Sequence, residues 1–210
     1  MTHRFSDRDV LLVIDVQNDF LPGGALAVPD GDAIVEPINH LAKRFPHVVL
    51  TQDWHAPRHH SFASTHGRPH FSTIDLSYGA QILWPEHCVQ GTFGAALAAG
   101  LDIPHAELII RKGYRPEVDS YSAFCEADRR TRTGLGGYLR ERGIGRVYLV
   151  GLATDFCVHW SAVDARHAGF EAIVIEDCCR AIDAQGSLAK AWTQMREAGV
   201  IRSTLAAALS

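Results

Sequence analysis

The stretch VYLVGLATDFCVHW, residues 147–160, decides the fold of this 210-residue chain. Four apolar residues precede Gly151, and Thr154 and Asp155 then begin a helical pattern, which is typical of a buried strand that turns sharply into a helix. Cys157 would lie in the first turn of that helix, where free N–H groups and the helix dipole favour a thiolate. We therefore expect a nucleophilic cysteine with a lowered pKa. The alternative is a small buried cysteine in an amphipathic helix.

The same alternation of strand and helix patterns runs along the chain. Apolar runs predict six strands, at 10–14, 48–50, 108–110, 146–150, 172–175 and from 200. Apolar spacing and glycine stops predict helices at 30–44, 135–142, 155–167 and 186–198. This alternation indicates a three-layer α/β/α fold with a six-stranded parallel sheet, Rossmann-like, in a single domain over residues 1–210. Between about 53 and 106 we expect an active-site loop excursion with short helical pieces.

Composition favours a small-molecule partner. The formal net charge of -4 provides no basic field for nucleic acid, and 47% hydrophobic residues can fill a sizeable core. No apolar run approaches the roughly 18 residues of a membrane span, and the N-terminal residues lack the apolar core of a signal peptide. We expect a cytoplasmic protein with no nucleic-acid or membrane partner. A homo-oligomer stays compatible with the sequence.

The five cysteines form an odd set without CxxC spacing: Cys88, Cys125, Cys157, Cys178 and Cys179. This pattern suggests neither a disulfide framework nor a cysteine zinc site. Reduced thiols in a reducing compartment fit it best.

Chemically useful residues follow four predicted strands at the point where each ends. They are Asp15, Asp53, Lys112 and Cys157. Ligands of doubly wound sheets bind beyond the carboxyl ends of the strands, where the winding direction reverses. The sequence therefore predicts an active site at this edge.

Five motifs resemble, in order and context, those of the isochorismatase-like cysteine hydrolases: LLVIDVQNDF, TQDWH, WPEHCVQG, IIRKGY and GLATDFCV. The resemblance extends from Val10 to at least Asp177, and DWH together with WPEHC narrows it to the metal-containing nicotinamidase branch of pyrazinamidase type. It implies the isochorismatase-like fold and an amidohydrolase that converts nicotinamide to nicotinate and ammonia through a thioester. The implied role is NAD salvage, with pyrazinamide as a side substrate.

By this resemblance Cys157 is the nucleophile, Asp15 the general acid/base and Lys112 the third member of a catalytic triad. An unperturbed thiol is only about 3% thiolate at pH 7, so its environment must activate it. The charge of Lys112 would favour the thiolate, and Asp15 can take the thiol proton and deliver it to departing ammonia. The resemblance also implies a cis peptide at Leu152–Ala153. The Ala153 and Cys157 N–H groups would then form an oxyanion hole.

Asp53 and His55 are candidate metal ligands. Residues i and i+2 of an extended backbone project to the same side, so a carboxylate and an imidazole can meet one ion. The resemblance adds His87, in WPEHC, as the third protein ligand. It leaves the remaining positions to water and the substrate's pyridine nitrogen, which makes the site an open one.

Further ligation after the DWH motif stays open. Adjacent His59, His60 and Ser61 offer no unambiguous match. His60 is a candidate for a direct ligand, and the alternative is a water-mediated or purely structural role. A mixed carboxylate and imidazole set suits one divalent transition metal ion, zinc, with manganese or iron as alternatives.

A flat aromatic substrate needs apolar walls. Phe20 and Trp84 match family positions that line the ring, and Tyr121 in SYSAF is a further candidate. Cys88, beside His87, is expected to be structural rather than catalytic.

Two other functions compete with this interpretation. A related hydrolase acting on a carbamoyl, ureido or vinyl-ether substrate would need no metal, so chelation and metal add-back with nicotinamide discriminates it. A non-catalytic metal-binding or thiol-sensing protein would not turn over nicotinamide at all.

Overall fold

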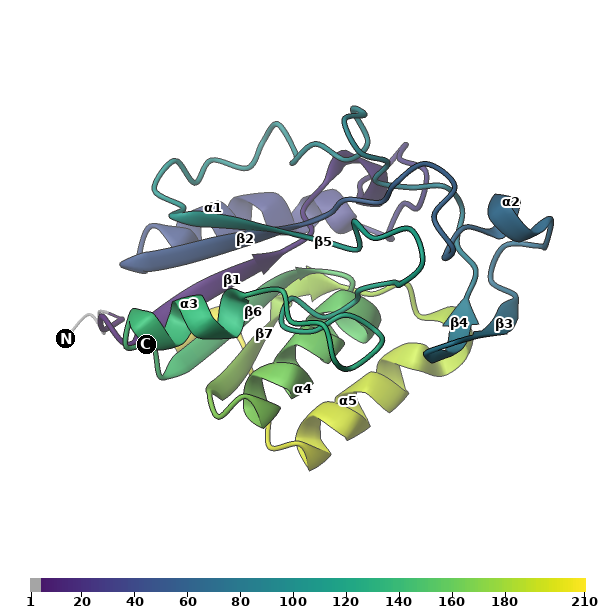
Figure 1. Ribbon diagram of the computed structural model, residues 1–210. Helices are drawn as coiled ribbons and strands as arrows, with labels where there is room; N and C mark the ends of the chain where they lie inside the picture. The colour runs from purple at the N-terminus through teal and green to yellow at the C-terminus, as the bar shows by residue number, and fades with distance from the viewer. Residues whose placement is uncertain (1–4) are drawn as a thin grey trace.

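The computed structural model describes residues 5–210 and has a six-stranded, all-parallel sheet between two layers of helices (Figure 1). The strand order is β5-β2-β1-β6-β7-β8. The strands are β1 (Asp9–Ile14), β2 (His47–Asp53), β5 (Leu108–Lys112), β6 (Arg146–Leu152), β7 (Glu171–Arg180) and β8 (Ile201–Ser203). The predicted α/β fold and all six predicted strands are confirmed.

Helices cover both faces of the sheet. In Figure 1, α1 lies behind the sheet, and α3, α4 and α5 lie in front of it. The helices are α1 (Val35–Ala42), α3 (Leu135–Glu141), α4 (His159–His167), α5 (Ser187–Glu197) and α6 (Leu205–Leu209). Short 3-10 turns are η1 (Asn18–Phe20), η2 (Gly31–Ile34) and η4 (Ala184–Gly186). Because both faces are covered, all six residues of β1 are buried, as expected for a continuous apolar run in a parallel sheet.

The winding direction reverses between β1 and β6. From β1 the chain proceeds outward to β2 and β5, and then returns to β6 on the other side of β1. Gly151 in β6 has φ +114°, and a Cβ there would lie 2.1 Å from the carbonyl oxygen of Ile14. Only glycine therefore permits this close approach, which brings Asp15 beside the turn that follows β6.

The turn after β6 differs from the predicted helix start. The peptide bond Leu152–Ala153 is cis, as the resemblance implied. A π-helical turn, η3 (Thr154–Val158), precedes α4, so Cys157 lies in a π-helical turn and not in the first turn of an α-helix. The Asp155 carboxylate accepts hydrogen bonds from the Ile182 and Asp183 amides, at 3.1 and 2.8 Å. These bonds tie the turn to the loop that follows β7.

The excursion between β2 and β5 contains more regular structure than predicted. It holds a one-turn helix, α2 (Ala63–His66), and an antiparallel hairpin of β3 (Thr73–Leu76) and β4 (Gly79–Ile82). In Figure 1 this hairpin lies beyond the carboxyl ends of the sheet strands. Its strands have four residues each and are largely exposed, which leaves little apolar periodicity for sequence analysis to detect.

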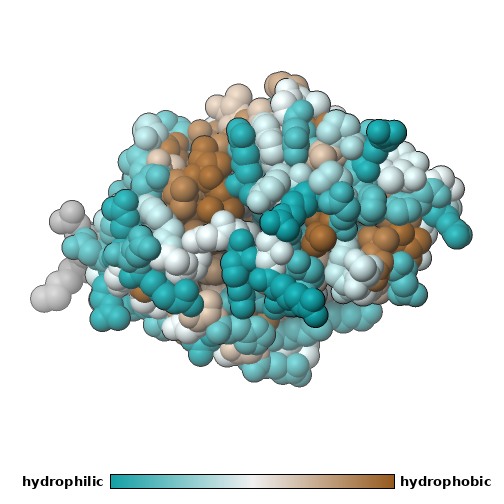
Figure 2. Space-filling model, in the orientation of Figure 1, coloured by the Kyte–Doolittle hydropathy of each residue, from teal (hydrophilic) through white to brown (hydrophobic). Residues whose placement is uncertain are grey.

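The surface is polar, with scattered apolar patches. Figure 2 shows one such patch over β5, the edge strand, where Ile109 is 47% exposed. Among residues 5–210, no helix has the length and apolar character needed to cross a membrane.

Candidate active site

Three residues from different strand ends meet at the carboxyl edge of the sheet. Asp15 follows β1, Lys112 ends β5, and Cys157 lies in the turn after β6. Lys112 Nζ lies 2.8 Å from Asp15 Oδ2 and 3.3 Å from Cys157 Sγ. All three side chains are buried. The structure thus brings the predicted triad into direct contact.

The ammonium group of Lys112 has more partners than hydrogens. Nζ donates to Asp53 Oδ1 at 2.5 Å, to the Ser120 carbonyl at 3.0 Å and to Cys157 Sγ at 3.3 Å. These bonds account for its three hydrogens. Asp15 Oδ2 therefore forms an ion pair with Nζ but accepts no hydrogen bond among the described residues.

This arrangement leaves Asp15 with a free lone pair beside the thiol. A carboxylate oxygen of Asp15 and Cys157 Sγ lie within 4.8 Å of one another. The other oxygen, Oδ1, accepts a 2.6 Å hydrogen bond from Thr51 Oγ1, which holds the carboxylate in place. Asp15 is thus positioned to accept the proton of Cys157.

The resting protonation states differ from the sequence prediction. Burial raises the pKa of the Cys157 thiol well above its usual value, and the opposing charge of Lys112 does not offset it. Burial likewise raises the pKa of Asp15, against the charge of Lys112. The predicted lowered cysteine pKa is therefore wrong, because desolvation disfavours the thiolate and Asp15 adds a like charge. Burial thus favours a neutral thiol at Cys157.

Lys112 keeps its charge despite burial. Desolvation lowers the pKa of its ammonium, but the carboxylates of Asp15 and Asp53 raise it well above the usual value. The ammonium therefore supplies a fixed positive charge next to Cys157 Sγ.

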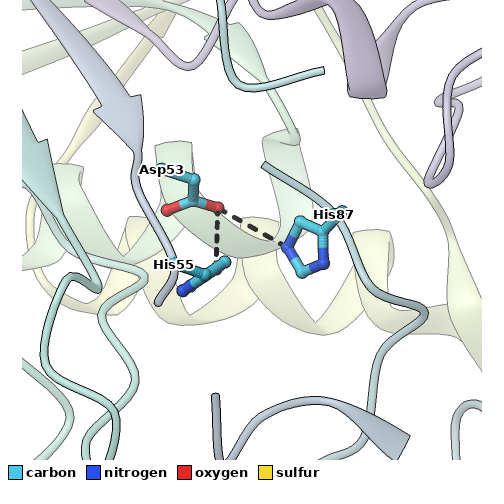
Figure 3. Close-up of side chains that lie close together, drawn as sticks. All are labelled: Asp53, His55 and His87. Carbon is cyan, nitrogen blue, oxygen red and sulfur yellow. Dashed lines mark ion pairs between the residues drawn. The ribbon is translucent and has the colours of Figure 1, made fainter. Parts of the chain in front are cut away.

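A second cluster lies beside the triad. Asp53, at the end of β2, faces His55 and His87, as Figure 3 shows. The Nε2 atoms of the two imidazoles lie 3.7 and 3.8 Å from Asp53 Oδ2. All three residues are buried, and their ligand atoms lie within 4.8 Å of one another.

Backbone carbonyls set the tautomers of both imidazoles. His55 Nδ1 lies 2.9 Å from the Gly113 carbonyl, and His87 Nδ1 lies 2.8 Å from the Pro85 carbonyl. A carbonyl only accepts, so each Nδ1 must carry the hydrogen and each Nε2 keeps its lone pair. Two such lone pairs and a carboxylate oxygen at one point fit a divalent metal ion, and carbonyl-oriented imidazoles are typical of metal sites.

Gly113 is required for this orientation. Its φ is +64°, and a Cβ there would lie 2.6 Å from Cε1 of the His55 ring. Lys112, at the end of β5, thus belongs to the first cluster, and Gly113, directly after β5, orients a residue of the second.

Gln17 positions Asp53, and sequence analysis did not identify it. Gln17 Oε1 accepts a 2.8 Å hydrogen bond from the Asp53 amide, and Gln17 Nε2 donates a 2.8 Å hydrogen bond to the Asp53 carbonyl. Although burial opposes it, the charge of Lys112 holds the pKa of Asp53 well below its usual value. Asp53 is therefore ionised. The signal for Gln17 was its place between Asp15 and Phe20 in the DVQNDF motif.

The histidines after the DWH motif have separate environments. The His59 ring lies 4.4 Å from that of His55, and its Nδ1 is 2.8 Å from Ser61 Oγ. Burial and the neighbouring His55 lower the pKa of His59 to about 4. The His60 ring instead packs against His66 at 5.9 Å and does not join the Asp53, His55 and His87 cluster.

Cys157 and the Asp53, His55 and His87 cluster line one pocket. The predicted Phe20, Trp84 and Tyr121 line it, together with Ala153 and Cys157. Whether the Ala153 and Cys157 amides bind an oxyanion stays a prediction.

Sequence analysis missed four wall residues: Leu26, Asp119, Phe156 and Ile182. The Phe156 ring meets Trp84 edge to face, with centroids 4.8 Å apart. Its position beside Cys157 in GLATDFCV was a usable signal. The others lie in loops without a motif.

The chain is similar in sequence to a known domain family and to proteins named nicotinamidase. An Isochorismatase domain model matches residues 9–207. A nicotinamidase of Acinetobacter baylyi is 58% identical over 193 residues, covering 91% of this chain and 90% of that protein. The nicotinamidase of Escherichia coli is 42% identical over 201 residues, with 93% and 94% covered.

Solved structures that are similar to this chain include a nicotinamidase and a pyrazinamidase. A nicotinamidase/pyrazinamidase of Acinetobacter baumanii superposes with a TM-score of 0.96 at 55% identity, covering 97% of this chain and 99% of that chain. A Leishmania (L. infantum) structure in complex with nicotinate has a TM-score of 0.86 at 40% identity, with 99% and 98% covered. A Pyrococcus horikoshii pyrazinamidase in complex with zinc has a TM-score of 0.77 at 34% identity, with 94% and 99% covered. This chain belongs to the isochorismatase family.

Proposed function

We propose that the protein is a nicotinamidase, an amidohydrolase that converts nicotinamide and water to nicotinate and ammonia for NAD salvage. The observation that carries this proposal is one aromatic-walled pocket lined by Cys157 and by the Asp53, His55 and His87 cluster, with Lys112 and Asp15 buried next to Cys157. Relatives at 58% and 42% identity named nicotinamidase support it. Structures named pyrazinamidase support pyrazinamide as a second substrate of the same pocket.

In the first half-reaction, Cys157 Sγ forms a bond to the carboxamide carbon as its proton passes to Asp15. The raised pKa of both groups suits this transfer, because a neutral thiol and a basic carboxylate can exchange one proton inside a dry site. Asp15 then delivers the proton to the nitrogen, the C–N bond breaks, and ammonia leaves a thioester on Cys157.

In the second half-reaction, water hydrolyses the thioester. Asp15 takes a proton from the attacking water, and the C–S bond breaks to release nicotinate and restore the thiol. The Lys112 ammonium stays charged next to Sγ throughout and stabilises negative charge that develops there. The Ala153 and Cys157 amides are the proposed donors to the carbonyl oxygen.

Asp53, His55 and His87 are the proposed ligands of one divalent metal ion, zinc, which the relative in complex with zinc supports. When bound, the metal supplies a Lewis acid that can orient a pyridine nitrogen. Phe20, Trp84 and the other walls hold the ring flat, so that its carboxamide faces Cys157.

The test combines turnover with elemental analysis. Purified protein should release ammonia and nicotinate from nicotinamide, and it should contain about one equivalent of a transition metal. Chelation should abolish turnover and metal add-back should restore it. Failure of the folded, metal-loaded protein to hydrolyse nicotinamide would reject the proposal. Metal-independent turnover of a carbamoyl or ureido compound would identify a different hydrolase of the family.

A further inference from the structure

The hairpin of β3 and β4 buries one polar side chain against the body of the protein. Gln81 is 2% exposed, whereas the other residues of these two strands are half-buried or exposed. A buried amide is costly unless its donors and acceptor are satisfied, so its partners indicate what the hairpin is held against.

Gln81 uses both ends of its amide. Nε2 lies 2.8 Å from Asp119 Oδ2 and 2.6 Å from the Ile82 carbonyl, and Oε1 accepts the Tyr78 hydroxyl at 3.0 Å. A carboxylate and a carbonyl only accept hydrogen bonds, so the amide nitrogen must face them, which determines the orientation of the side chain. Nε2 also lies 3.3 Å from the Tyr121 hydroxyl.

The Tyr121 hydroxyl accepts a hydrogen bond from Trp84 Nε1 at 2.9 Å. Gln81 Nε2 makes a longer contact with the same oxygen, at 3.3 Å, because its two hydrogens are directed to Asp119 and the Ile82 carbonyl. Both nitrogens are donors only, so the hydrogen of Tyr121 itself takes part in neither contact. It has no acceptor among residues 5–210. Burial also raises the pKa of Tyr121 well above its usual value, so the phenol retains that hydrogen.

Gln81 lies outside the pocket, in contact with two residues that line it. Tyr121 and Asp119 line the pocket that contains Cys157, but Gln81 does not. Gln81 lines the neighbouring hollow instead, which has an empty volume of about 690 Å³ and shares Tyr121 with the pocket. The Tyr121 ring packs against Trp84 and Phe156, and the Trp84 and Gln81 nitrogens position its hydroxyl beside this hollow.

We propose that Gln81 is a positioning residue for the aromatic amide substrate, acting through Tyr121 and Asp119. It holds the Tyr121 ring against the substrate ring and keeps the phenol hydrogen available to an acceptor on the substrate. The hairpin therefore contributes to substrate affinity from outside the pocket. This inference rests on the proposed function, because nicotinamide turnover provides its readout.

Gln81→Met is the first variant, because methionine has nearly the same length and volume but cannot form these hydrogen bonds. We expect the KM for nicotinamide to rise about tenfold with kcat within about twofold. Thr73→Ala, on the exposed face of the same hairpin, is the matched control and should change neither. Titration calorimetry with nicotinate should show the same loss of affinity without turnover. A merely structural role would lower the active fraction, and thus kcat, and leave KM unchanged.

Tyr78→Phe and a double-mutant cycle complete the test. Tyr78→Phe removes only the hydroxyl that orients Gln81 Oε1, so KM should rise less than in Gln81→Met, about twofold to threefold. If Gln81 acts through Tyr121, Gln81→Met combined with Tyr121→Phe should be no worse than Tyr121→Phe alone. A wild-type KM and nicotinate affinity in Gln81→Met would overturn this inference, as would fully multiplicative effects in the cycle. Nicotinamide turnover by the wild-type protein would still support the proposed function.

Discussion

The two clusters of the active site are held by different kinds of structure. Asp15 and Lys112 stand at the ends of buried strands, whose parallel register determines where each side chain begins. His55 and His87 stand in loops, and single hydrogen bonds to the Gly113 and Pro85 carbonyls orient them. The difference indicates that Asp15 and Lys112 are fixed by the sheet, whereas the two imidazoles beside Asp53 are fixed by loops. Mutations should therefore separate the two.

The largest effect is expected at the nucleophile. Cys157→Ala should lower ammonia release from nicotinamide by about 10⁴-fold or more, because no other group can form the thioester. Metal content and nicotinate affinity should stay close to wild type, since Asp53, His55 and His87 are unchanged. Kinetics, elemental analysis and calorimetry check these three quantities.

Cys178→Ala is the matched control, because it also removes a buried thiol but lies outside the pocket. It should retain wild-type turnover. Loss of metal in Cys157→Ala would show that the two clusters are not separable.

A smaller effect is expected in the cluster of Asp53, His55 and His87. His87→Ala should lose metal on dialysis and lower nicotinamide turnover roughly a hundredfold, because an orienting ligand is lost while the thiol and its partners stay. The exposed His40→Ala serves as control and should keep both metal and activity. Equal turnover in His87→Ala and wild type would remove His87 from the site.

Gly113 tests the link between the clusters. In Gly113→Ala the new Cβ would meet the His55 ring at 2.6 Å, so metal affinity should fall about tenfold. Gly143→Ala is matched, since Gly143 also has a positive φ, +71°, but a Cβ added there would have no neighbour within 4 Å. Both variants should lose about 1 kcal/mol of stability from backbone strain. Only Gly113→Ala should change metal binding, which competitive titration with a chelating dye measures.

The smallest effect concerns how the stability of the folded protein changes in acid. His159 begins α4, directly after the turn that carries Cys157, and burial lowers its pKa to about 4. Between pH 6.5 and 4 the unfolded chain therefore binds more protons at this residue than the folded chain, so stability falls as the pH falls. Between pH 7 and 5.5 His159 should cost about 1 kcal/mol.

His159→Gln should flatten this part of the pH profile. Urea unfolding at both pH values measures the difference between the variant and the wild type. Identical pH profiles for the two proteins would contradict the assignment.

The strand ends could be predicted from sequence because apolar runs mark the strands locally. The run before Asp15 ends directly at that residue, the run at 108–110 ends two residues before Lys112, and a parallel sheet brings such ends to one edge. Motif resemblance added His87, which follows no strand. Fold class and the triad positions therefore followed from local patterns.

Residues that position other residues of the site left no such pattern in the sequence. Gln17, Gln81 and Asp119 lie in loops or a short hairpin, and the contacts of Gln17 with Asp53 and of Gln81 with Asp119 and Tyr121 join residues 36 to 40 apart. Sequence periodicity reports burial of a face and cannot show which hydrogen bond a buried amide makes. The pKa of Cys157 was mispredicted for a related reason, because desolvation depends on how completely the assembled site excludes water.

The raised pKa of Cys157 has a consequence for survival under oxidising conditions. Peroxide attacks thiolates, and the other four cysteines are also free and buried, so the resting protein offers oxidants few reactive sulfurs. In the proposed mechanism Cys157 loses its proton only while an amide is being attacked. The fold thus shields the sulfur atom that we propose as the nucleophile, without needing a disulfide or a second cysteine.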